Sequence, residues 1–348
     1  RINTTYVVLI LMKKKKLNAL VIGLGVGEKH LNFLKKNKDI KKISIFDTKI
    51  DYTKKIAKKN NTDYFVKSQK VFSDKDTNLV IIASPDHTHS DYIIKAFKEK
   101  KHVFTEKPIC NNLKELQTIV TQWKKNKDNI KFRSNLILRS SPLFLWLKNK
   151  IKDGYFGEIY SIDVEYLYGR LKKFVKGWRG NNKEYSPMNG GGIHMIDLAC
   201  WLTNELPYEV VSSGSKLATK KYKLKSNDFV TSIFNFKSGL ILKATANLAC
   251  VYRHQHTIKI YGTKKTFIYD DLGPRLYYSR KPRAKSKKIN IKNLPSNKTN
   301  ILETFINNIT KSKNINHETK FDLKVMNVLC YCNISLKTKK KQKIQYII

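Results

Sequence analysis

Two segments of this sequence carry side chains that could move a proton beside an oxygen. The tripeptide Glu106-Lys107-Pro108 places an ammonium group directly after an apolar run, and His194 and Asp197 follow the glycines of segment 189–193. An ammonium can stabilise an oxygen that becomes negative, and an imidazole can take a proton near neutral pH. Three residues apart, His194 and Asp197 would share a helix face, where a carboxylate can orient an imidazole. A core histidine satisfied by a carboxylate is an equally good interpretation.

Phosphate binding is the second kind of chemistry that the sequence indicates. The turn Gly23-Leu24-Gly25-Val26-Gly27 stands between an apolar strand pattern at 17–22 and a helical pattern at 28–36. Gly23 permits a tight turn, Gly25 lets the backbone approach a pyrophosphate, and the helix start offers free N–H groups. The spacing is GxGxG, one residue shorter than the usual GxGxxG. Strand, glycine turn and helix together predict a dinucleotide cofactor.

An acidic residue after the next predicted strand bears on which dinucleotide binds. The strand pattern at 42–46 ends at Asp47, 24 residues after Gly23, where an acid binds a ribose diol and repels a 2′-phosphate. Lys49 lies close to it and weakens this preference. We therefore expect NAD in preference to NADP.

The order of predicted elements assigns the chain to the α/β class. Strand 78–83, helix 90–100 and strand 102–105 form a βαβ crossover. Strands and helices alternate to about residue 135, as in a doubly wound parallel sheet. This predicts a Rossmann dinucleotide-binding domain at 12–134.

The remaining part of the chain, 135–348, is expected to be an α+β domain with a mainly antiparallel open sheet. A helix is predicted at 141–153, and turn signals at 237–239 and 262–265 separate adjacent apolar runs, as in hairpins. The predicted strands are 157–168, 208–218, 228–236, 240–249, 256–261, 266–269 and 344–347, and the last two helices are 301–313 and 322–336.

The charge of the chain limits the partners that it can have. With 69 basic and 27 acidic side chains, the formal net charge is +42 at pH 7, which on its own suggests nucleic acid or an anionic membrane. The lysines, however, are spread over every predicted helix and loop. We interpret them as a solvated surface and expect no nucleic-acid or membrane partner. Such a surface would still attract anionic substrates such as sugar nucleotides.

Cysteine usage and the N-terminus bear on location. The five cysteines contain no CxxC pair and leave an odd one over, which is typical of reduced thiols in a cytoplasmic protein. Residues 6–12 are apolar but precede a lysine run, the reverse of a signal peptide. Because Met12 is the first methionine, we expect 1–11 to be a non-native or disordered extension. His87 and His89 are spaced like metal ligands, but no third ligand is placed to complete a set, so we expect no metal.

These motifs resemble those of the Gfo/Idh/MocA oxidoreductases. The resemblance rests on the glycine turn, Ala83-Ser84-Pro85-Asp86-His87-Thr88-His89, Glu106-Lys107-Pro108, the glycine-rich segment that ends at His194, and Tyr261-Gly262-Thr263. It extends over nearly the whole chain from Met12. It implies NAD(P)-dependent oxidation or reduction of a sugar hydroxyl or carbonyl group by a homo-oligomer, a dimer or a tetramer.

The resemblance also implies roles for single residues. The lysine of the family's EKP tripeptide, beside the nicotinamide and the substrate oxygen, corresponds to Lys107, and the histidine of its DxGxH segment corresponds to His194. We expect the cofactor to be bound by Gly23, Gly25, Val26, Gly27, Asp47, Ser84, Pro85, His89, Glu106 and Lys107.

The substrate is expected at Lys107, His194, Arg170 and Arg179. The segments that hold the two arginines are most similar to family members encoded with polysaccharide and nucleotide-sugar biosynthesis. Such arginines could bind a diphosphate with two parallel hydrogen bonds each, although solvated loop arginines are an equally good interpretation.

The sequence departs from the family at one position. The family's aspartate, four residues before His194, is replaced by Gly190, which cannot titrate. A proton relay would then rest on His194 and Lys107, with Asp197 or Tyr185 as candidate partners.

Three functions follow from these observations. The leading one is an NAD-dependent dehydrogenase of a sugar or nucleotide sugar. A redox-neutral enzyme, in which bound NAD is reduced and reoxidised within one turnover, is the alternative among enzymes. The third is a catalytically silent, NAD-binding regulator that senses sugars, although a pure sensor would need neither Lys107 nor His194.

Overall fold

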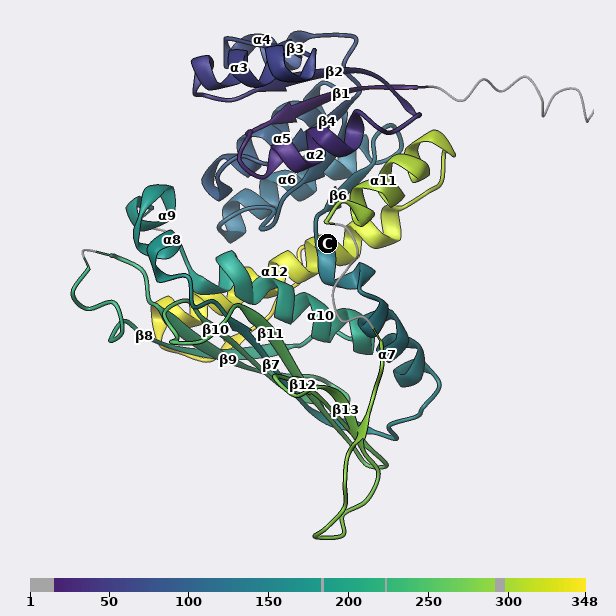
Figure 1. Cartoon of the computed structure of the whole chain (residues 1–348), viewed down its shortest axis with the longest axis vertical. Helices are drawn as coiled ribbons and strands as arrows, with labels where there is room; N and C mark the ends of the chain where they lie inside the picture. Colours follow the sequence, from purple (N-terminus) through teal and green to yellow (C-terminus); the bar gives the residue numbers. More distant parts are fainter. Residues whose placement is uncertain (1–15, 183–184, 223, 292–297) are drawn as a thin grey trace, which may run out of the picture. The chain divides into compact units, whose positions relative to one another are not determined.

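The computed structural model describes residues 16–182, 185–222, 224–291 and 298–348, so the predicted extension 1–11 lies outside the described residues. The chain divides into two compact units (Figure 1). The first unit ends at Glu106 and also includes Thr121–Asn135 and Ile301–Thr319, and the second holds the rest. Both units are therefore discontinuous, whereas the expected domains 12–134 and 135–348 are contiguous; those boundaries stay a prediction.

The first unit contains the expected Rossmann sheet. Its six strands have the order β3-β2-β1-β4-β5-β6, and every neighbouring pair is parallel. This order reverses between β1 and β4, which is the switch point of a dinucleotide-binding fold. The strands are β1 (Leu17–Ile22), β2 (Ile40–Phe46), β3 (Asp63–Tyr64), β4 (Leu79–Ile82), β5 (His102–Thr105) and β6 (Phe132–Ser134).

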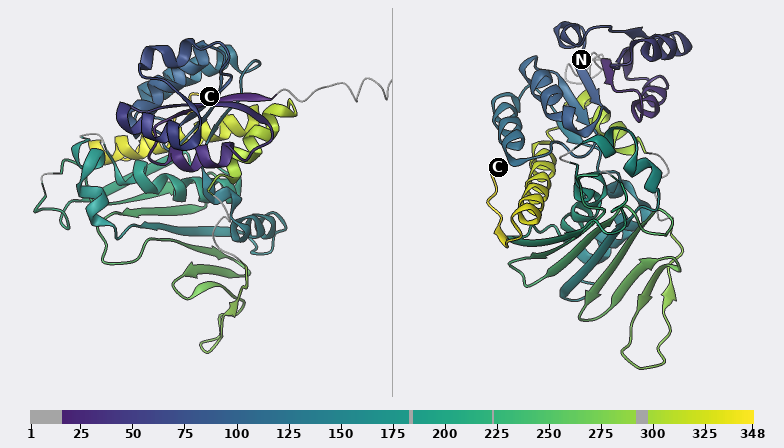
Figure 2. Two further views of the ribbon diagram at one scale, coloured as in Figure 1. Left: turned by 45° about the horizontal axis from the view of Figure 1, so that its top comes forward. Right: turned by 90° about the vertical axis from the view of Figure 1, so that its left-hand side faces the viewer.

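Helices cover both faces of this sheet, so its central strands are buried and read as continuous apolar runs (Figure 2). They are α2 (Gly27–Leu34), α3 (Ile50–Asn60), α4 (Ser68–Ser73), α5 (His89–Lys98) and α6 (Leu113–Asn126). Helix α11 (Asn300–Thr310) also belongs here. Its buried residues Leu302, Phe305, Ile306 and Ile309 follow a helical period and join the core of β1 and β5.

The second unit is built on a sheet of nine strands in the order β14-β13-β12-β11-β7-β10-β9-β8-β15. The strands are β7 (Ile159–Leu167), β8 (Glu209–Ser215), β9 (Phe229–Asn235), β10 (Ile241–Asn247), β11 (Gln255–Gly262), β12 (Thr266–Asp270), β13 (Gly273–Tyr277), β14 (Lys287–Lys288) and β15 (Gln342–Lys343). The predicted hairpins β9–β10 and β11–β12 are confirmed. The sheet is mixed, however, because β7 inserts between β10 and β11 and pairs parallel with β10.

Two predicted details at the end of the chain are wrong. The strand expected at 344–347 lies instead at Gln342–Lys343, where only two residues pair with β8. Strand β14, which extends the sheet beside β13, is missing from the predicted strands. Both strands are too short to show an alternating pattern in the sequence.

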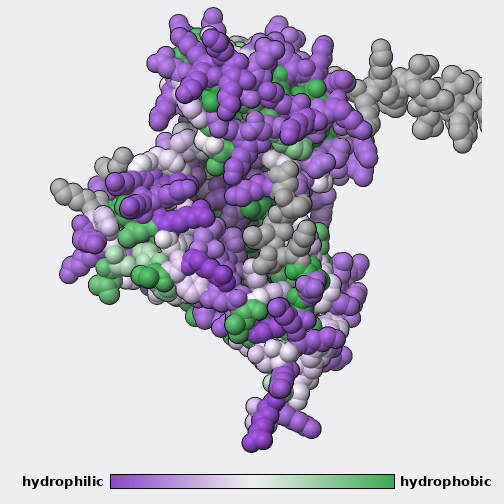
Figure 3. Space-filling model, viewed as in Figure 1, coloured by the Kyte–Doolittle hydropathy of each residue, from purple (hydrophilic) through white to green (hydrophobic). Residues whose placement is uncertain are grey.

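Helices α7 (Pro142–Lys152), α10 (Ile193–Thr203) and α12 (Asn316–Thr338) belong largely to the second unit, with α10 packed against α7, β7 and β10. None of the helices among the described residues has both the length and the apolar character to cross a bilayer. On the face shown in Figure 3, hydrophilic residues cover most of the first unit, as the interpretation of the lysines as a solvated surface requires.

Candidate functional site

In the first unit, the glycine turn joins β1 to α2 at the end of the sheet. Gly23 has φ +85°, and a Cβ on it would lie 2.6 Å from the backbone of Ser84, so the ends of β1 and β4 approach too closely for any side chain. Around Gly25 no atom lies within 4 Å of a Cβ position, which leaves open space over the turn. Val26 is half exposed, and Gly27 begins α2 against Val21.

Asp47 ties the end of β2 to the same turn. Its Oδ2 accepts a hydrogen bond from the backbone N–H of Leu24 at 2.8 Å, and its Oδ1 accepts from the N–H of Lys49 at 3.0 Å and the hydroxyl of Thr48 at 3.4 Å. A carboxylate has about four acceptor positions, so one remains for a ribose hydroxyl. The glycine turn and the carboxylate of Asp47 therefore lie together within one unit, and their role in binding a cofactor stays a prediction.

A cavity of about 150 Å³ lies between these strand ends. Its walls include Gly23, Asp47, Thr48, Ser84, Pro85 and Tyr92. His89 was expected to border the cofactor, but it is fully buried, and its Nε2 lies 2.9 Å from the backbone oxygen of Ser84, so it supports the loop from behind. Thr48 and Tyr92 were not predicted from the sequence, although both follow directly on elements that carry predicted residues.

Glu106 is held by two side chains of its own unit. Its Oε1 accepts a hydrogen bond from Asn135 Nδ2 at 2.7 Å and lies 2.9 Å from Nε2 of the buried His30 on α2. Neither partner could be predicted from the sequence, since both are far from Glu106 along the chain. Glu106 therefore links the glycine-turn helix to the end of β5.

In the second unit, Lys107 follows directly on Glu106 and precedes a cis bond to Pro108. Its Nζ donates a hydrogen bond to the backbone oxygen of Gly190 at 2.7 Å. The two motifs found in the sequence, EKP and the glycine-rich segment, thus meet through this bond. It fixes the ammonium beside the turn that leads into α10.

The side chain of Tyr185 occupies the space beside Gly190, where the resemblance places an aspartate. A Cβ on Gly190 would lie 1.9 Å from Oη of Tyr185 and 2.7 Å from its Cζ. Tyr185 is buried and packs against Phe174 and Trp178, with ring centroids 6.0 and 5.8 Å away. The phenol therefore fills the space that a side chain at position 190 would need.

His194 lies in the first turn of α10 within a cluster of rings. Tyr166 on β7 is stacked with it at 6.4 Å, and His256 on β11 lies edge-on at 6.0 Å. His254 completes the cluster, 5.2 Å from both Tyr166 and His256. Since His256 and Tyr166 are direct partners in the β7–β11 pairing, the register of the sheet brings these rings together. The sequence analysis did not identify Tyr166, His254 or His256.

The histidines of this cluster are neutral at pH 7. Burial, followed by the charge of Lys107 and the neighbouring histidines, holds the pKa of His194 well below its usual range. Burial lowers the pKa of His254 to about 4 and that of His256 to about 3, even though both keep some accessible surface. The buried Nδ1 of His194 has no hydrogen-bond partner in the described part of the chain. His194 can therefore accept a proton.

Asp197 is engaged by a buried arginine. Arg139 donates from Nε to both carboxylate oxygens at 3.1 Å and from a terminal nitrogen to Oδ1 at 2.5 Å, while its other terminal nitrogen donates to Asp322 at 2.8 Å. This buried ion-pair set joins α10 to α12 and to the turn Ile137–Ser140. The ion pair with Arg139 was not expected from the sequence, and a role of Asp197 in orienting His194 stays a prediction.

The two predicted substrate arginines lie against aromatic rings. The guanidinium of Arg179 lies 4.4 Å from the ring centre of Trp178, and that of Arg170 lies 5.7 Å from Tyr168, which is stacked on Tyr166 at 5.8 Å. Arg170 is exposed and Arg179 is half-buried.

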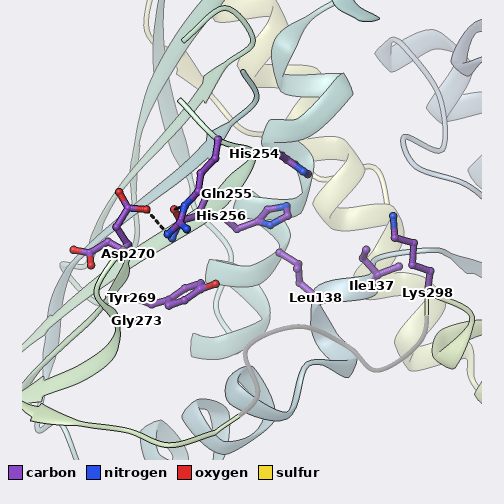
Figure 4. A pocket seen from close by; sticks show the side chains of 11 residues that line it. Ile137, Leu138, His254, Gln255, His256, Tyr269, Asp270, Gly273 and Lys298 are labelled. Atoms are coloured by element: carbon purple, nitrogen blue, oxygen red, sulfur yellow. Dashed lines mark hydrogen bonds and ion pairs between the residues drawn. The ribbon is translucent and has the colours of Figure 1, made fainter. Parts of the chain in front are cut away.

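A second cavity, of about 410 Å³, opens beside the ring cluster (Figure 4). His254 and His256 form part of its wall together with Leu138, Arg253 and Lys298. Among the described residues, no group of three or more His, Cys, Asp or Glu side chains is arranged to hold a metal.

Comparison with known proteins gives a consistent answer for both parts of the chain. Residues 17–132 match an oxidoreductase family with an NAD-binding Rossmann fold, and residues 144–268 match the GFO/IDH/MocA C-terminal domain. Myo-inositol 2-dehydrogenase of Thermotoga maritima is 26% identical over 260 residues, 72% of this chain and 75% of that protein. The 2,7-anhydro-N-acetylneuraminate hydratase of Escherichia coli is 26% identical over 73% of this chain and 68% of that protein.

The fold is shared with solved structures. A levoglucosan dehydrogenase in complex with NADH and levoglucosan superposes with a TM-score of 0.79 at 17% identity, over 95% of this chain and all of that chain.

Proposed function

The chain belongs to the Gfo/Idh/MocA family of oxidoreductases and uses NAD, and on that premise we propose that it is a dehydrogenase of a sugar or nucleotide sugar. The observation that carries the proposal is the pairing of a fixed ammonium with a neutral, buried imidazole: Lys107 is held at the carbonyl of Gly190, four residues before His194. Dehydrogenase names among the relatives, such as myo-inositol 2-dehydrogenase, support an alcohol substrate.

In the oxidation direction, the imidazole of His194 takes the proton of the substrate hydroxyl. The ammonium of Lys107 donates a charge-assisted hydrogen bond to the oxygen as it becomes an alkoxide. When bound, NAD supplies the acceptor for the hydride that leaves the carbon. Proton and hydride are thus both accounted for, because His194 releases its proton to solvent, directly or through the hydroxyl of Tyr185, which gives up its own proton as it takes this one.

The other residues of the second site support these two. We propose that Tyr185, whose hydroxyl fills the space over Gly190, keeps Lys107 in register and takes the place of a side chain at 190. Asp197 acts as a positioning residue, because its ion pair with Arg139 fixes the helix that carries His194. Arg170 and Arg179 bind the phosphate groups of a nucleotide-linked substrate.

The preference for NAD over NADP rests on Asp47. The N–H groups of Leu24 and Lys49 fix the carboxylate of Asp47. This carboxylate would accept a hydrogen bond from a ribose hydroxyl of NAD and repel the 2′-phosphate of NADP. Ser84 and Pro85 supply the opposite wall of the same cavity.

We also propose a homo-oligomer that uses the open face of the nine-stranded sheet. Val211, Ile233 and Ile241, on the adjacent strands β8, β9 and β10, are 40–48% exposed, which is unusual for three neighbouring apolar side chains. Light scattering of the wild type and of Ile233→Lys tests this, and a monomeric wild type would contradict it. A cytoplasmic location and a role in polysaccharide biosynthesis stay predictions.

The experiment that tests the function starts with purified protein. Any nucleotide released on denaturation is identified, and reduction of NAD is then measured with free and nucleotide-linked sugars. We expect NADH to form with at least one sugar or nucleotide sugar, at a rate that His194→Ala lowers ~10²- to 10⁴-fold. The exposed His317 provides a matched control, since His317→Ala should keep the wild-type rate.

A redox-neutral reaction is the second candidate, and the hydratase among the relatives favours it. Tightly bound NAD that a sugar converts without net NADH would support this reaction. NAD binding with no conversion of any sugar would instead support a regulator.

A further inference from the structure

The cavity beside the ring cluster has the size and chemistry of a ligand site. Its volume of about 410 Å³ falls within the usual range for small-molecule pockets, ~300–1,000 Å³. Leu138 gives it an apolar side, and His254, Gln255, His256 and Lys298 give it hydrogen-bonding groups. Figure 4 shows the two histidine rings and Lys298 around the same opening.

The acidic groups in the wall are neutralised by arginines. Asp270 accepts hydrogen bonds from both terminal nitrogens of Arg275, at 2.5 and 2.8 Å, and Asp271 accepts one from Arg253 at 2.5 Å. Each aspartate in the wall therefore has a guanidinium partner, and a ligand meets little negative charge from this side of the cavity.

The cations near the cavity act together on its histidines. Burial is the largest cause of the lowered pKa of His254. The positive charges of Arg170, Lys298 and Lys107, which are far apart in the sequence, lower it further. Lys107 and Lys298 act on His256 in the same direction. Three basic side chains thus act on one histidine of the cavity wall. The same positive charges would stabilise an anion in the cavity.

We propose that this cavity binds an anionic group of the substrate, a carboxylate or a phosphate, so that the enzyme acts on acidic or phosphorylated sugars rather than neutral ones. The inference rests on the proposed function, because it places the anion next to the ring cluster that contains His194. Lys298 supplies a point charge to the anion, and the N–H groups of His254 and Gln255 supply directional hydrogen bonds.

The test is calorimetric binding to the NAD-loaded protein. The ligands are glucose, glucuronate, glucose 6-phosphate and inorganic phosphate. We expect at least one of the two anionic sugars to bind roughly tenfold to a hundredfold more tightly than glucose, as one or two charge-assisted hydrogen bonds would give. Glucuronate and glucose 6-phosphate separate a carboxylate from a phosphate. The affinity for the preferred anion should fall as salt is added.

Variants assign the binding to this cavity. Lys298→Gln and His254→Gln should each lower the affinity for the preferred anionic sugar about tenfold and leave the affinity for glucose unchanged. Lys287→Gln, a change on the exposed strand β14 of the same unit, should alter neither. Equal affinities for charged and neutral sugars, or anion binding that the Lys298 and His254 variants do not change, would overturn the proposal.

The outcome also separates this inference from the proposed function. If neutral sugars reduce NAD through His194 and the anionic sugars do no better, the anion site is wrong and the dehydrogenase stands. If the anionic sugars bind as expected and no sugar reduces NAD, the anion site stands and the dehydrogenase is wrong.

Discussion

The cofactor cavity of the first unit and the polar site of the second unit are built from different material. In the first unit, backbone atoms take part in the contacts that hold Gly23 and Asp47 at the cavity. Gly23 lies against the backbone of Ser84, and the carboxylate of Asp47 accepts from the N–H groups of Leu24 and Lys49. Each contact joins the end of one parallel strand to the loop after another.

In the second unit, side chains make the site. The ring of Tyr166 contacts His194 on α10, His256 on β11 and His254 in the loop directly before β11. The backbone takes part through the bond from Lys107 to the Gly190 carbonyl. A site made of backbone tolerates changes of side chain as long as the chain path is kept, whereas a site made of side chains depends on each of them. The two sites should therefore respond differently to substitution.

The largest difference is expected at the reacting groups. Lys107→Ala and His194→Ala should each lower turnover ~10²- to 10⁴-fold. The first removes the ammonium that stabilises the alkoxide, and the second removes the base that takes the proton of the hydroxyl. Binding of NAD should change little, since neither side chain shapes the first unit's cavity. Steady-state rates with the sugar found active, and NAD affinity by fluorescence, measure the two effects separately.

The His317→Ala and Lys243→Ala variants serve as matched controls on exposed positions. Wild-type turnover in Lys107→Ala and His194→Ala would show that the second unit's site is not the place of the chemistry. A loss of NAD affinity equal to the loss of turnover would show that the two sites are not independent.

The next difference concerns two glycines. Gly190→Ala places a methyl group 1.9 Å from the hydroxyl of Tyr185, which is wedged between Phe174 and Trp178 and cannot move freely. We expect a loss of ~1–3 kcal/mol in the free energy of unfolding, as for other overpacked sites. Gly25→Ala meets no atom within 4 Å and should leave the free energy of unfolding almost unchanged while it weakens NAD binding.

Urea unfolding of both alanine variants measures the contrast. The double variant Gly190→Ala/Tyr185→Ala should lose less free energy of unfolding than the two single variants together, with a coupling of ~0.5–3 kcal/mol. The reason is that removing the phenol makes room for the methyl group. Strict additivity would mean that Tyr185 does not restrict position 190.

These contrasts explain what could be predicted from the sequence. The Rossmann order, the turn at Gly23 and the acid at Asp47 follow from one stretch with a fixed spacing, so local pattern was sufficient. His254 and His256 join His194 only through the register of β7 and β11, which no local pattern contains. The parallel pairing of β7 with β10 escaped prediction for the same reason.

Helix α11 shows the same limit at the level of the fold. Its apolar positions predict a helix, and that helix is present at Asn300–Thr310. Nothing in the pattern states which core it covers, and it packs on the first unit's sheet through Phe305 and Phe104, with ring centroids 5.7 Å apart. The partner of an amphipathic helix depends on the path of the whole chain.

A smaller effect, on the affinity for the dinucleotide, is expected from a substitution of Asp47 in the wall of the first unit's cavity. Asp47→Asn keeps the size of the side chain and removes its charge, so NAD should bind about tenfold more weakly and NADP relatively better. Titration of both dinucleotides, followed by fluorescence, gives the ratio. Asp51→Asn, on the exposed side of α3, is the matched control. An unchanged ratio in Asp47→Asn would remove Asp47 from cofactor selection.

The smallest effect is expected in how the free energy of unfolding depends on pH, through a histidine of the second unit's site. Burial lowers the pKa of His256 to about 3, so the unfolded chain takes up a proton near the usual histidine pKa of about 6.5, long before the folded chain does. The stability that this histidine contributes is therefore complete above that pH and declines between about pH 6.5 and about pH 3. One such proton makes the free energy of unfolding fall by at most about 1.4 kcal/mol per pH unit.

His256→Gln removes this proton and should flatten the decline by up to that amount, whereas His317→Gln, on the exposed surface of α12, should not. Urea unfolding at several values between about pH 7 and about pH 5 measures the slopes. Because the glycine turn and the Asp47 cavity contain no buried neutral histidine of this kind among their walls, NAD affinity should not follow the same curve. Equal slopes for the wild type and His256→Gln would mean that His256 titrates alike in the folded and unfolded chain, and the ring cluster would then lack the field on which the anion site depends.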